Sequence, residues 1–185
     1  MISLLKKSKN AKDTENIMGY EGQISQLYWS GFRIITKLSY FTRTHQHSND
    51  PYNQALNYAY AIIYNRVQSA LLKEGLNIYY SFLHSTNYNK PSLVFDMVEI
   101  FRQPIVDREI ISIITKNQKL TQTKGRLSEN TKKIIIQHIQ KRLVSFTKTR
   151  YGRTTYLNLI SFEANSLKLA FERTEKNHHF FIAKY

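Results

Sequence analysis

Apolar residues recur at helical spacing along most of the chain, which predicts a mainly α protein. The first predicted helix covers residues 14–40, and the second runs from Pro51 to Glu74. Asp50 before Pro51 is a typical helix start, because Asp caps the first turn and proline is favoured at the first helical position. Gly75 then predicts the end of this helix.

The second half of the chain keeps the helical pattern but interrupts it more often. Pro91 opens a third helix, in which Pro104 predicts a kink or a break. The polar residues 116–127 contain threonines and one glycine, and they could form a short β-hairpin. Two further helices are expected over residues 128–146 and 156–173. The pattern therefore predicts a compact multi-helix fold with at most a small β element.

Length and composition fit one domain with its own hydrophobic core. The chain has 185 residues, of which 42% are hydrophobic. We expect a helical domain over residues 14–185, preceded by a basic linker or frayed N-terminus over residues 1–13. The absence of cysteine excludes disulfides and thiolate metal sites. No apolar run approaches the ~20 residues that span a bilayer, so we expect a cytoplasmic protein without a membrane partner.

The charge balance is unusual for a chain of this composition. There are 27 Lys and Arg residues against 13 Asp and Glu, which gives a formal net charge of +14. Such a surplus predicts a polyanionic partner, with nucleic acid first and an anionic membrane surface second. Among the 13 Tyr and 10 Phe, some could stack on bases, although most lie at core spacing. A basic protein without such a partner is the alternative.

One short stretch in the middle of the chain brings three candidate metal ligands together. His84, Asp96 and Glu99 are close in sequence, and the two acids are spaced i, i+3, so they share one face of a predicted helix. Buried carboxylates are costly unless they are paired or bind a cation, so a divalent metal site would explain all three. This donor set suits Mg²⁺ or Mn²⁺, with Zn²⁺ also possible. The alternative is a solvated face whose acids pair with Arg102 and Lys90.

Other chemistry-bearing residues give weaker signals. Glu21 lies on the first predicted helix and could add a third carboxylate, but a single Glu on an exposed helix face is common. His45 and His47 form a His-x-His pattern in a polar loop, and without a third ligand nearby we interpret them as exposed. His138 lies on an apolar helical stripe, which is typical of a core histidine. The sequence contains no glycine-rich phosphate loop and no serine-histidine-aspartate order.

Four motifs follow one another in an informative order. They read GYEGQISQLYW at 19–29, DPYNQALNYAYAII at 50–63, GLNIYYSFLH at 75–84 and FDMVEIFRQPIVDR at 95–108. Together they resemble the C-terminal catalytic domain of the CRISPR-associated Cas1 family of integrases. The stretch from the first motif to the last covers about half of the chain. One departure is Asn77-Ile78, where the family usually has Asp-Pro, and it changes the turn but not the ligands.

The resemblance implies a site and a reaction. It implies metal binding by Glu21, His84 and Glu99, with Asp96 beside the metal and acting in catalysis. The implied cofactor is Mg²⁺ or Mn²⁺, and the implied chemistry is phosphoryl transfer on DNA. A DNA 3′-hydroxyl would be joined to target DNA during CRISPR spacer acquisition in antiviral defence, or water would act instead in an endonuclease reaction.

The resemblance also implies partners. Double-stranded DNA is the substrate, and Lys90, Arg102 and Arg108 are close enough in sequence to clamp its phosphates. In the family a β-rich domain normally comes first and builds a dimer, whereas this chain starts at what would be the linker helix. We therefore expect that domain to be absent, which leaves Cas2 binding and self-association open. The alternatives are an inactive DNA-binding helical module, an architectural subunit, or a transposon-type integrase of the same superfamily.

Overall fold

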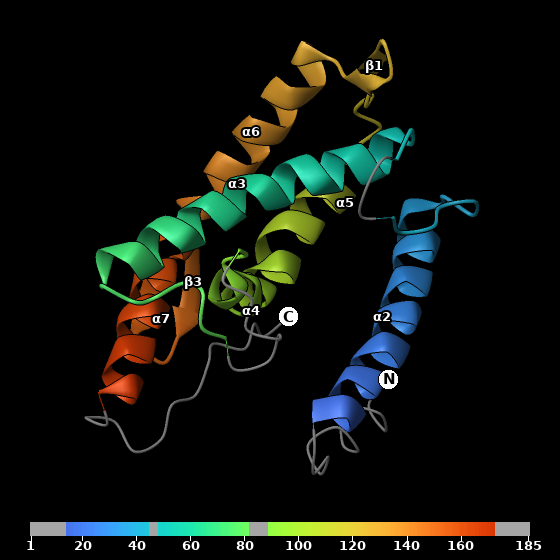
Figure 1. Cartoon of the computed structure of the whole chain (residues 1–185). Helices are drawn as coiled ribbons and strands as arrows, with labels where there is room; N and C mark the ends of the chain where they lie inside the picture. The colour runs from blue at the N-terminus through green and yellow to red at the C-terminus, as the bar shows by residue number, and fades with distance from the viewer. Residues whose placement is uncertain (1–13, 45–47, 82–88, 173–185) are drawn as a thin grey trace.

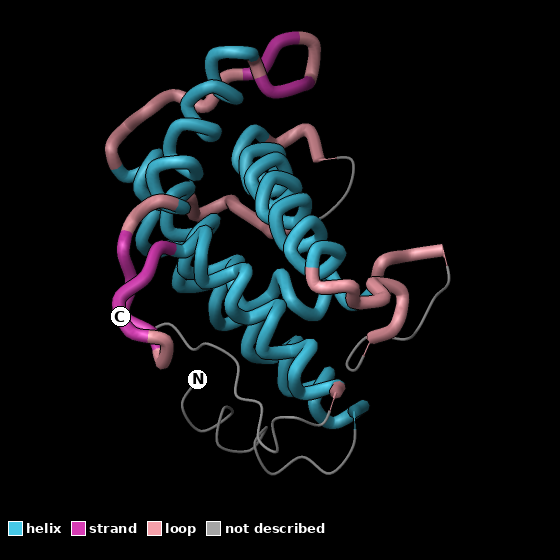
Figure 2. The backbone as a smooth tube through the Cα atoms, turned by 90° about the vertical axis from the view of Figure 1, so that its left-hand side faces the viewer, coloured by secondary structure: helices cyan, strands magenta, loops and turns pink. Residues whose placement is uncertain are grey.

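The computed structural model describes residues 14–44, 48–81 and 89–172, so the expected linker at 1–13 lies outside the described residues. Its elements, in chain order, are α2 (Thr14–Thr36), α3 (Pro51–Lys73), α4 (Ser92–Phe101), the π-helix η1 (Arg102–Asp107), α5 (Arg108–Thr115), β1 (Gln122–Thr123), β2 (Arg126–Leu127), α6 (Glu129–Leu143), β3 (Phe146–Thr149), β4 (Gly152–Thr155) and α7 (Tyr156–Phe171). The fold is mainly α, as predicted, and the described strands form two separate antiparallel pairs. These two hairpins lie at separate edges of the helical body (Figure 2).

Helix α3 is the central element, and it packs against α4, η1, α6 and α7 (Figure 1). It begins as predicted, because the Asp50 side chain accepts a hydrogen bond from the Asn53 backbone N–H at 2.8 Å and Pro51 follows the cap. It also ends where expected, since Gly75 adopts a φ of +77° that side chains other than glycine rarely adopt. These two local signals thus set the ends of the helix against which much of the fold packs.

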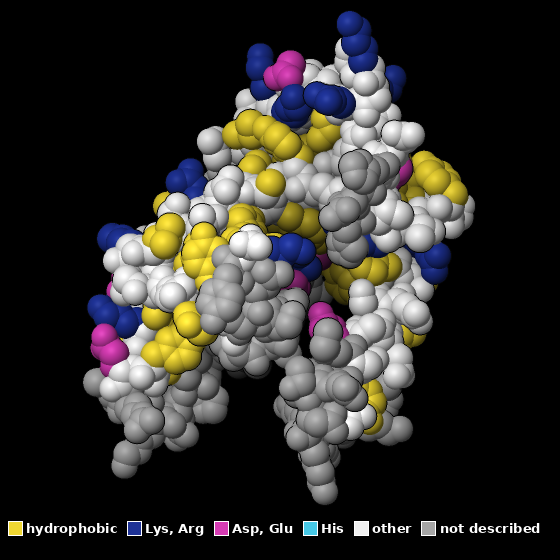
Figure 3. Space-filling model, in the orientation of Figure 1, with side chains coloured by type: hydrophobic (Ala, Val, Ile, Leu, Met, Phe, Trp, Pro, Cys, Tyr) yellow, Lys and Arg dark blue, Asp and Glu magenta, His cyan; other side chains and the backbone are white. Residues whose placement is uncertain are grey.

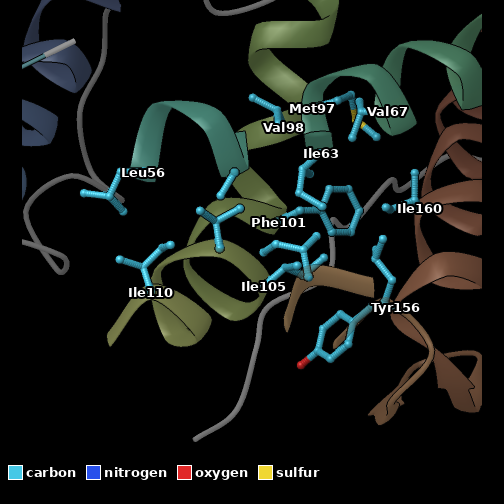
Figure 4. Close-up of a cluster of buried hydrophobic side chains, with 14 of the residues drawn as sticks. Leu56, Ile63, Val67, Met97, Val98, Phe101, Ile105, Ile110, Tyr156 and Ile160 are labelled. Atoms are coloured by element: carbon cyan, nitrogen blue, oxygen red, sulfur yellow. The ribbon is translucent and has the colours of Figure 1, made fainter. Parts of the chain in front are cut away.

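The hydrophobic core forms where α3, α4, η1 and α7 meet. Figure 4 shows side chains from these elements gathered around Phe101, which is fully buried. Its labelled neighbours in that view include Ile63 of α3, Ile105 of η1 and Ile160 of α7. Burying such aliphatic and aromatic side chains supplies the main favourable term in folding, about 1.5–3 kcal/mol for each one. The core therefore holds η1 and α4 firmly in place.

The predicted helix continues through Pro104 as a π-helical segment. Helix α4 passes directly into η1 and then into α5, so the chain stays helical through the proline. Proline removes one N–H donor and clashes with the preceding turn, and a π-helical turn is one way to accommodate both effects. The carbonyl oxygen of Pro104 accepts a hydrogen bond from Arg142 Nε of α6 at 2.9 Å. The wide turn is thereby attached to a neighbouring helix.

The hairpin expected within residues 116–127 is confirmed, with Thr123 paired to Arg126. Its turn places Lys124 at φ +52° and Gly125 at φ +74°, as a two-residue type I′ turn requires. The expectation of a helix over residues 128–146 is wrong at its end. Helix α6 stops at Leu143, and a second hairpin, β3–β4, follows from Phe146.

Helix α2 lies to one side of the body and packs against α5 (Figure 1). It ends at Thr36 rather than near residue 40, because Lys37 adopts a φ of +58°. Within the described parts of the chain, no helix is both long enough and apolar enough to cross a membrane.

Candidate active site

A cavity of about 430 Å³ separates α2 from the rest of the helical body. Figure 3 shows this hollow, with acidic side chains on both of its sides. Its walls come from α2, the segment after it, α3, α4 and η1, and they consist of Glu21, Ile24, Ser25, Tyr28, Trp29, Arg43, Tyr60, Glu99, Arg102, Gln103 and Asp107. Residues of α2 three or four positions apart share one face of the helix, which explains why this set repeats along α2.

Glu21 and Glu99 face the same cavity from opposite walls, α2 and α4. Glu21 is exposed, whereas Glu99 is partly buried. An oxygen of Glu99 lies 2.5 Å from Arg102 Nη1, so the arginine balances its charge. Two carboxylates facing one cavity fit the oxygen ligands that Mg²⁺ and Mn²⁺ prefer. The structure therefore brings together two of the three predicted metal ligands.

Asp96 lies one turn before Glu99 on α4 but has a different environment. It is only 6% exposed, and it does not belong to the cavity wall. Its Oδ2 accepts a hydrogen bond from Ser81 Oγ at 2.8 Å. Asp96 and Glu99 are thus spaced i, i+3 on α4, but their side chains lie in different environments. Asp96 is tied to the residue that directly precedes the segment containing His84.

His84, the third predicted ligand, falls in residues 82–88 and lies outside the described residues. Among the residues that are described, no group of three His, Asp or Glu side chains is arranged to hold a metal. His45 and His47 also lie outside the described residues. His138 was expected to be a core histidine, but it is only partly buried, and its Nδ1 lies 2.9 Å from an oxygen of Glu109.

The three arginine and lysine residues predicted to contact DNA occupy different surroundings. Lys90 and Arg108 are exposed, and neither belongs to the walls of the described cavity. Arg102 lines the cavity, and its guanidinium stacks over the ring of Tyr60 at 4.9 Å from the centroid. Of these three, Arg102 is the one that can reach a phosphate beside the two carboxylates.

Asp107 is a buried acid at the floor of the cavity whose role the sequence did not reveal. It is 3% exposed and accepts hydrogen bonds from two tyrosine hydroxyls, Tyr28 at 2.7 Å and Tyr60. Burial raises the pKa of Asp107, while the two hydrogen bonds and the nearby arginines act in the opposite direction. Burial and the Asp107 carboxylate raise the pKa of Tyr60 well above its ordinary value. This cluster ties α2, α3 and η1 together below the cavity.

Arg43 also lines the cavity and was not predicted. Its guanidinium donates to Asn53 Oδ1 at 2.9 Å and to Asn57 Oδ1 at 2.7 Å. It also lies 5.7 Å from the Trp29 ring centroid and 5.5 Å from that of Tyr60. A lone arginine in a polar loop carries no sequence signal. By contrast, tyrosines on an apolar helical stripe and an aspartate in an isoleucine-valine run hint at a buried polar contact.

Comparison of the sequence with known proteins identifies a family that matches this chain. The family model of the CRISPR-associated protein Cas1 matches residues 1–141, which is most of the chain. The chain belongs to the Cas1 family. A curated Cas1 protein from Methanobrevibacter ruminantium is 35% identical over 134 residues, which cover 69% of this chain and 40% of the relative. A Cas1 endonuclease from Thermus thermophilus is 30% identical over 178 residues, covering 92% of this chain and 56% of the relative.

Solved structures show the same fold. A casposase bound to an integration product matches with a TM-score of 0.85 and 25% identity, over 95% of this chain and 55% of the casposase. A Cas1 protein from Thermotoga maritima matches with a TM-score of 0.79 and 20% identity, over 92% of this chain and 56% of that protein. The chain thus spans about half the length of the Cas1 relatives it matches.

Proposed function

We propose that this chain carries the catalytic part of a metal-dependent DNA integrase and endonuclease that acts in CRISPR spacer acquisition. The observation that carries the proposal is a cavity lined by both Glu21 and Glu99, with Arg102 paired to Glu99, in a member of the Cas1 family. The names of its relatives support it, since one is a CRISPR-associated endonuclease and another is a casposase bound to an integration product.

The proposed cofactor is Mg²⁺ or Mn²⁺, with Glu21, Glu99 and His84 as ligands. The donor set fits such a cation, because it combines carboxylate oxygens with one imidazole nitrogen. When bound, the cation would offset the negative charge that develops on the phosphoryl oxygens. The rest of the chemistry falls to side chains of this chain.

Arg102 has two candidate partners in the cavity. In the structure it neutralises Glu99 at 2.5 Å and stacks on Tyr60. Its planar guanidinium can donate two parallel hydrogen bonds to a phosphate, which suits it to hold the scissile group. We expect Arg102 to turn from Glu99 to a phosphate oxygen when DNA enters.

Asp96 is proposed as a catalytic residue whose contact with Ser81 also holds the start of the segment leading to His84. In strand joining, a DNA 3′-hydroxyl would attack phosphorus, and the bond between that phosphorus and the 3′-oxygen of the target strand would break. One phosphodiester bond forms as another is lost, and the hydroxyl proton passes to the departing 3′-oxygen. With water as nucleophile, the same site would cleave DNA.

Double-stranded DNA is the proposed substrate, consistent with the net charge of +14. Lys90 and Arg108 are proposed as phosphate contacts outside the cavity, because both are exposed. Cas2 and a second copy of the chain are proposed partners that follow from the family alone.

A second function is favoured by one observation. The match to a casposase, at a TM-score of 0.85, is consistent with a transposon-type integrase that uses the same chemistry on other DNA. The two functions differ in the target that supports joining. A CRISPR repeat should be the preferred target in spacer acquisition, and joining without that preference would favour the transposon-type function.

The experiment is a joining assay that mixes a duplex carrying 3′-hydroxyl ends with supercoiled plasmid, with and without Mn²⁺. We expect Glu21→Gln and Glu99→Gln each to lower the joining rate by at least about 100-fold, because both remove a charged ligand from the site. The matched control is Glu129→Gln, which removes an exposed carboxylate on α6. Joining at the wild-type rate by both cavity variants would overturn the assignment.

A further inference from the structure

Arg43 lines three neighbouring cavities. It lines the cavity of about 430 Å³ that contains Glu21 and Glu99, a neighbour of about 480 Å³ along α2, and another of about 340 Å³ along α3. The third cavity also contains Arg102. A strand passing from either neighbour into the carboxylate cavity would therefore meet the guanidinium of Arg43.

The positive charge of Arg43 is held by neutral groups. Its described hydrogen bonds go to the Thr44 carbonyl and to the Oδ1 atoms of Asn53 and Asn57. Its Nε is buried and has no hydrogen-bond partner among the described residues. Asp107 also acts electrostatically on Arg43, but this carboxylate already accepts hydrogen bonds from two tyrosines. A half-buried cation whose hydrogen-bond partners among the described residues are all neutral gains from an added anion.

The guanidinium is also oriented before any ligand arrives. The rings of Trp29 and Tyr60 lie within 5.7 Å and 5.5 Å of its central carbon, and the two asparagines fix its plane. Burial lowers the pKa of Arg43, which adds to the energetic benefit of a nearby negative charge. A fixed planar fork loses little side-chain entropy on binding, so it suits phosphate recognition.

We propose that Arg43 binds a phosphate of the DNA strand that enters the Glu21–Glu99 cavity. The inference rests on the proposed function and names a contact within it. The contact is to the backbone of the strand, so it adds affinity and register but does not read sequence. Arg43 and Arg102 would then both hold phosphates next to Tyr60, since both guanidiniums lie over its ring.

The competing explanation is that Arg43 has a purely structural role and only attaches residues 42–44 to α3 through its hydrogen bonds. Three substitutions separate the two. Arg43→Met removes the charge and the hydrogen bonds, whereas Arg43→Lys keeps the charge. Asn57→Ala keeps the arginine but removes one of its hydrogen bonds to α3. Lys133→Met serves as the matched control, because it removes the same charge from an exposed position on α6.

The measurement is the affinity for a fluorescent duplex with 3′-hydroxyl ends, followed by anisotropy over a series of salt concentrations without divalent cations. For Arg43→Met we expect the slope of log K against log salt to fall by about 0.9 and the affinity to drop about tenfold, as for one lost phosphate contact. Arg43→Lys, Asn57→Ala and Lys133→Met should keep the wild-type slope to within about a third of that change.

Two results would overturn the inference. One is an unchanged slope of log K against log salt for Arg43→Met, together with a melting temperature as low as that of Asn57→Ala. Arg43 would then have only a structural role. The other is an equal loss of slope for Lys133→Met, which would show a general charge effect. If Arg43→Met does not fold, Arg43→Gln takes its place with the same expected slope and the same two contrary results.

The joining assay keeps this inference separate from the proposed function. A wild-type chain that joins no DNA, together with a slope change at Arg43, would support the phosphate contact and count against integration. A wild-type chain that joins DNA, together with an unchanged slope and rate in Arg43→Met, would overturn the Arg43 inference alone.

Discussion

Asp107 brings three helices together through one carboxylate. Tyr28 of α2 and Tyr60 of α3 donate to its two oxygens, and Asp107 itself ends η1. A buried carboxylate without these donors would be costly, because hydrogen bonds to a charged group contribute about 1.5–3 kcal/mol. Its position therefore links the packing of α2 to the floor of the proposed site.

The raised pKa of Asp107 predicts a pH dependence of stability. Because burial lifts the folded-state pKa above the ordinary value of 3.8, the folded state binds the proton more tightly than the unfolded state. This contribution to stability is present below pH 3.8 and is lost as pH rises through the folded-state pKa. Asp107→Asn lacks the titration. Urea unfolding from pH 3 upward should show wild type losing stability relative to Asp107→Asn over that window, and a constant difference would contradict the prediction.

The sequence predicted individual residues unevenly. The i, i+3 spacing of Asp96 and Glu99 was visible, but only the structure shows that Asp96 bonds Ser81 while Glu99 faces the cavity. Glu21 lies 78 positions before Glu99, so spacing could not connect them, and the family resemblance did. The roles of Asp107 and Arg43 could not be predicted, because the burial of a single charged side chain depends on neighbours from other parts of the chain.

Helix α4, η1 and α5 form one continuous helical segment, and it carries both Glu99 and Arg102. Its π turn at Pro104 is attached to α6 by Arg142, whose Nε donates to the Pro104 carbonyl at 2.9 Å. Another nitrogen of Arg142 donates to Tyr156 Oη at 2.9 Å, and the guanidinium stacks over that ring at 4.5 Å. One side chain therefore links η1, α6 and α7.

Arg142→Met should lower the free energy of unfolding by about 1.5–3 kcal/mol, because it leaves the Pro104 carbonyl without its donor and removes a charge-assisted bond. The control is Lys141→Met, which changes an exposed neighbour on the same helix and should stay within about 0.5 kcal/mol. Urea unfolding of both variants checks the prediction. Equal losses in the two would show that general charge, not the link to η1, matters.

Local chemistry explains which elements could be predicted. The β1–β2 hairpin was visible because Lys124-Gly125 supplies the turn within the strand pair itself. The β3–β4 hairpin was missed because Val144 and Phe146 look like a continuation of the helical stripe, yet each is 61% exposed. That hairpin is attached to the fold by a residue distant in sequence. Arg150 of its turn forms an ion pair, at 3.6 Å, with the buried Glu163 of α7.

At the scale of the whole molecule, the proposed site forms between a helical body and a helix beside it. Helix α2 brings Glu21 to the cavity, and the Tyr28–Asp107 bond and the packing on α5 hold α2 in place. Pattern and composition could predict the mainly α class and a polyanionic partner. They could not predict the cavity, because it depends on how α2 docks, which no local signal encodes.

If that docking sets the separation of Glu21 and Glu99, then Tyr28→Phe should weaken metal binding without removing a ligand. Losing one hydrogen bond to a buried carboxylate changes the docking free energy by about 1.5–3 kcal/mol, so the Mn²⁺ concentration for half-maximal joining should rise at least about tenfold. Excess Mn²⁺ should restore the maximal rate, because the ligands remain. Tyr58→Phe on α3 is the control, because Tyr58 packs against the core and does not belong to the cavity wall. An unchanged Mn²⁺ requirement in Tyr28→Phe, together with reduced stability, would show that the bond holds the fold without setting the site.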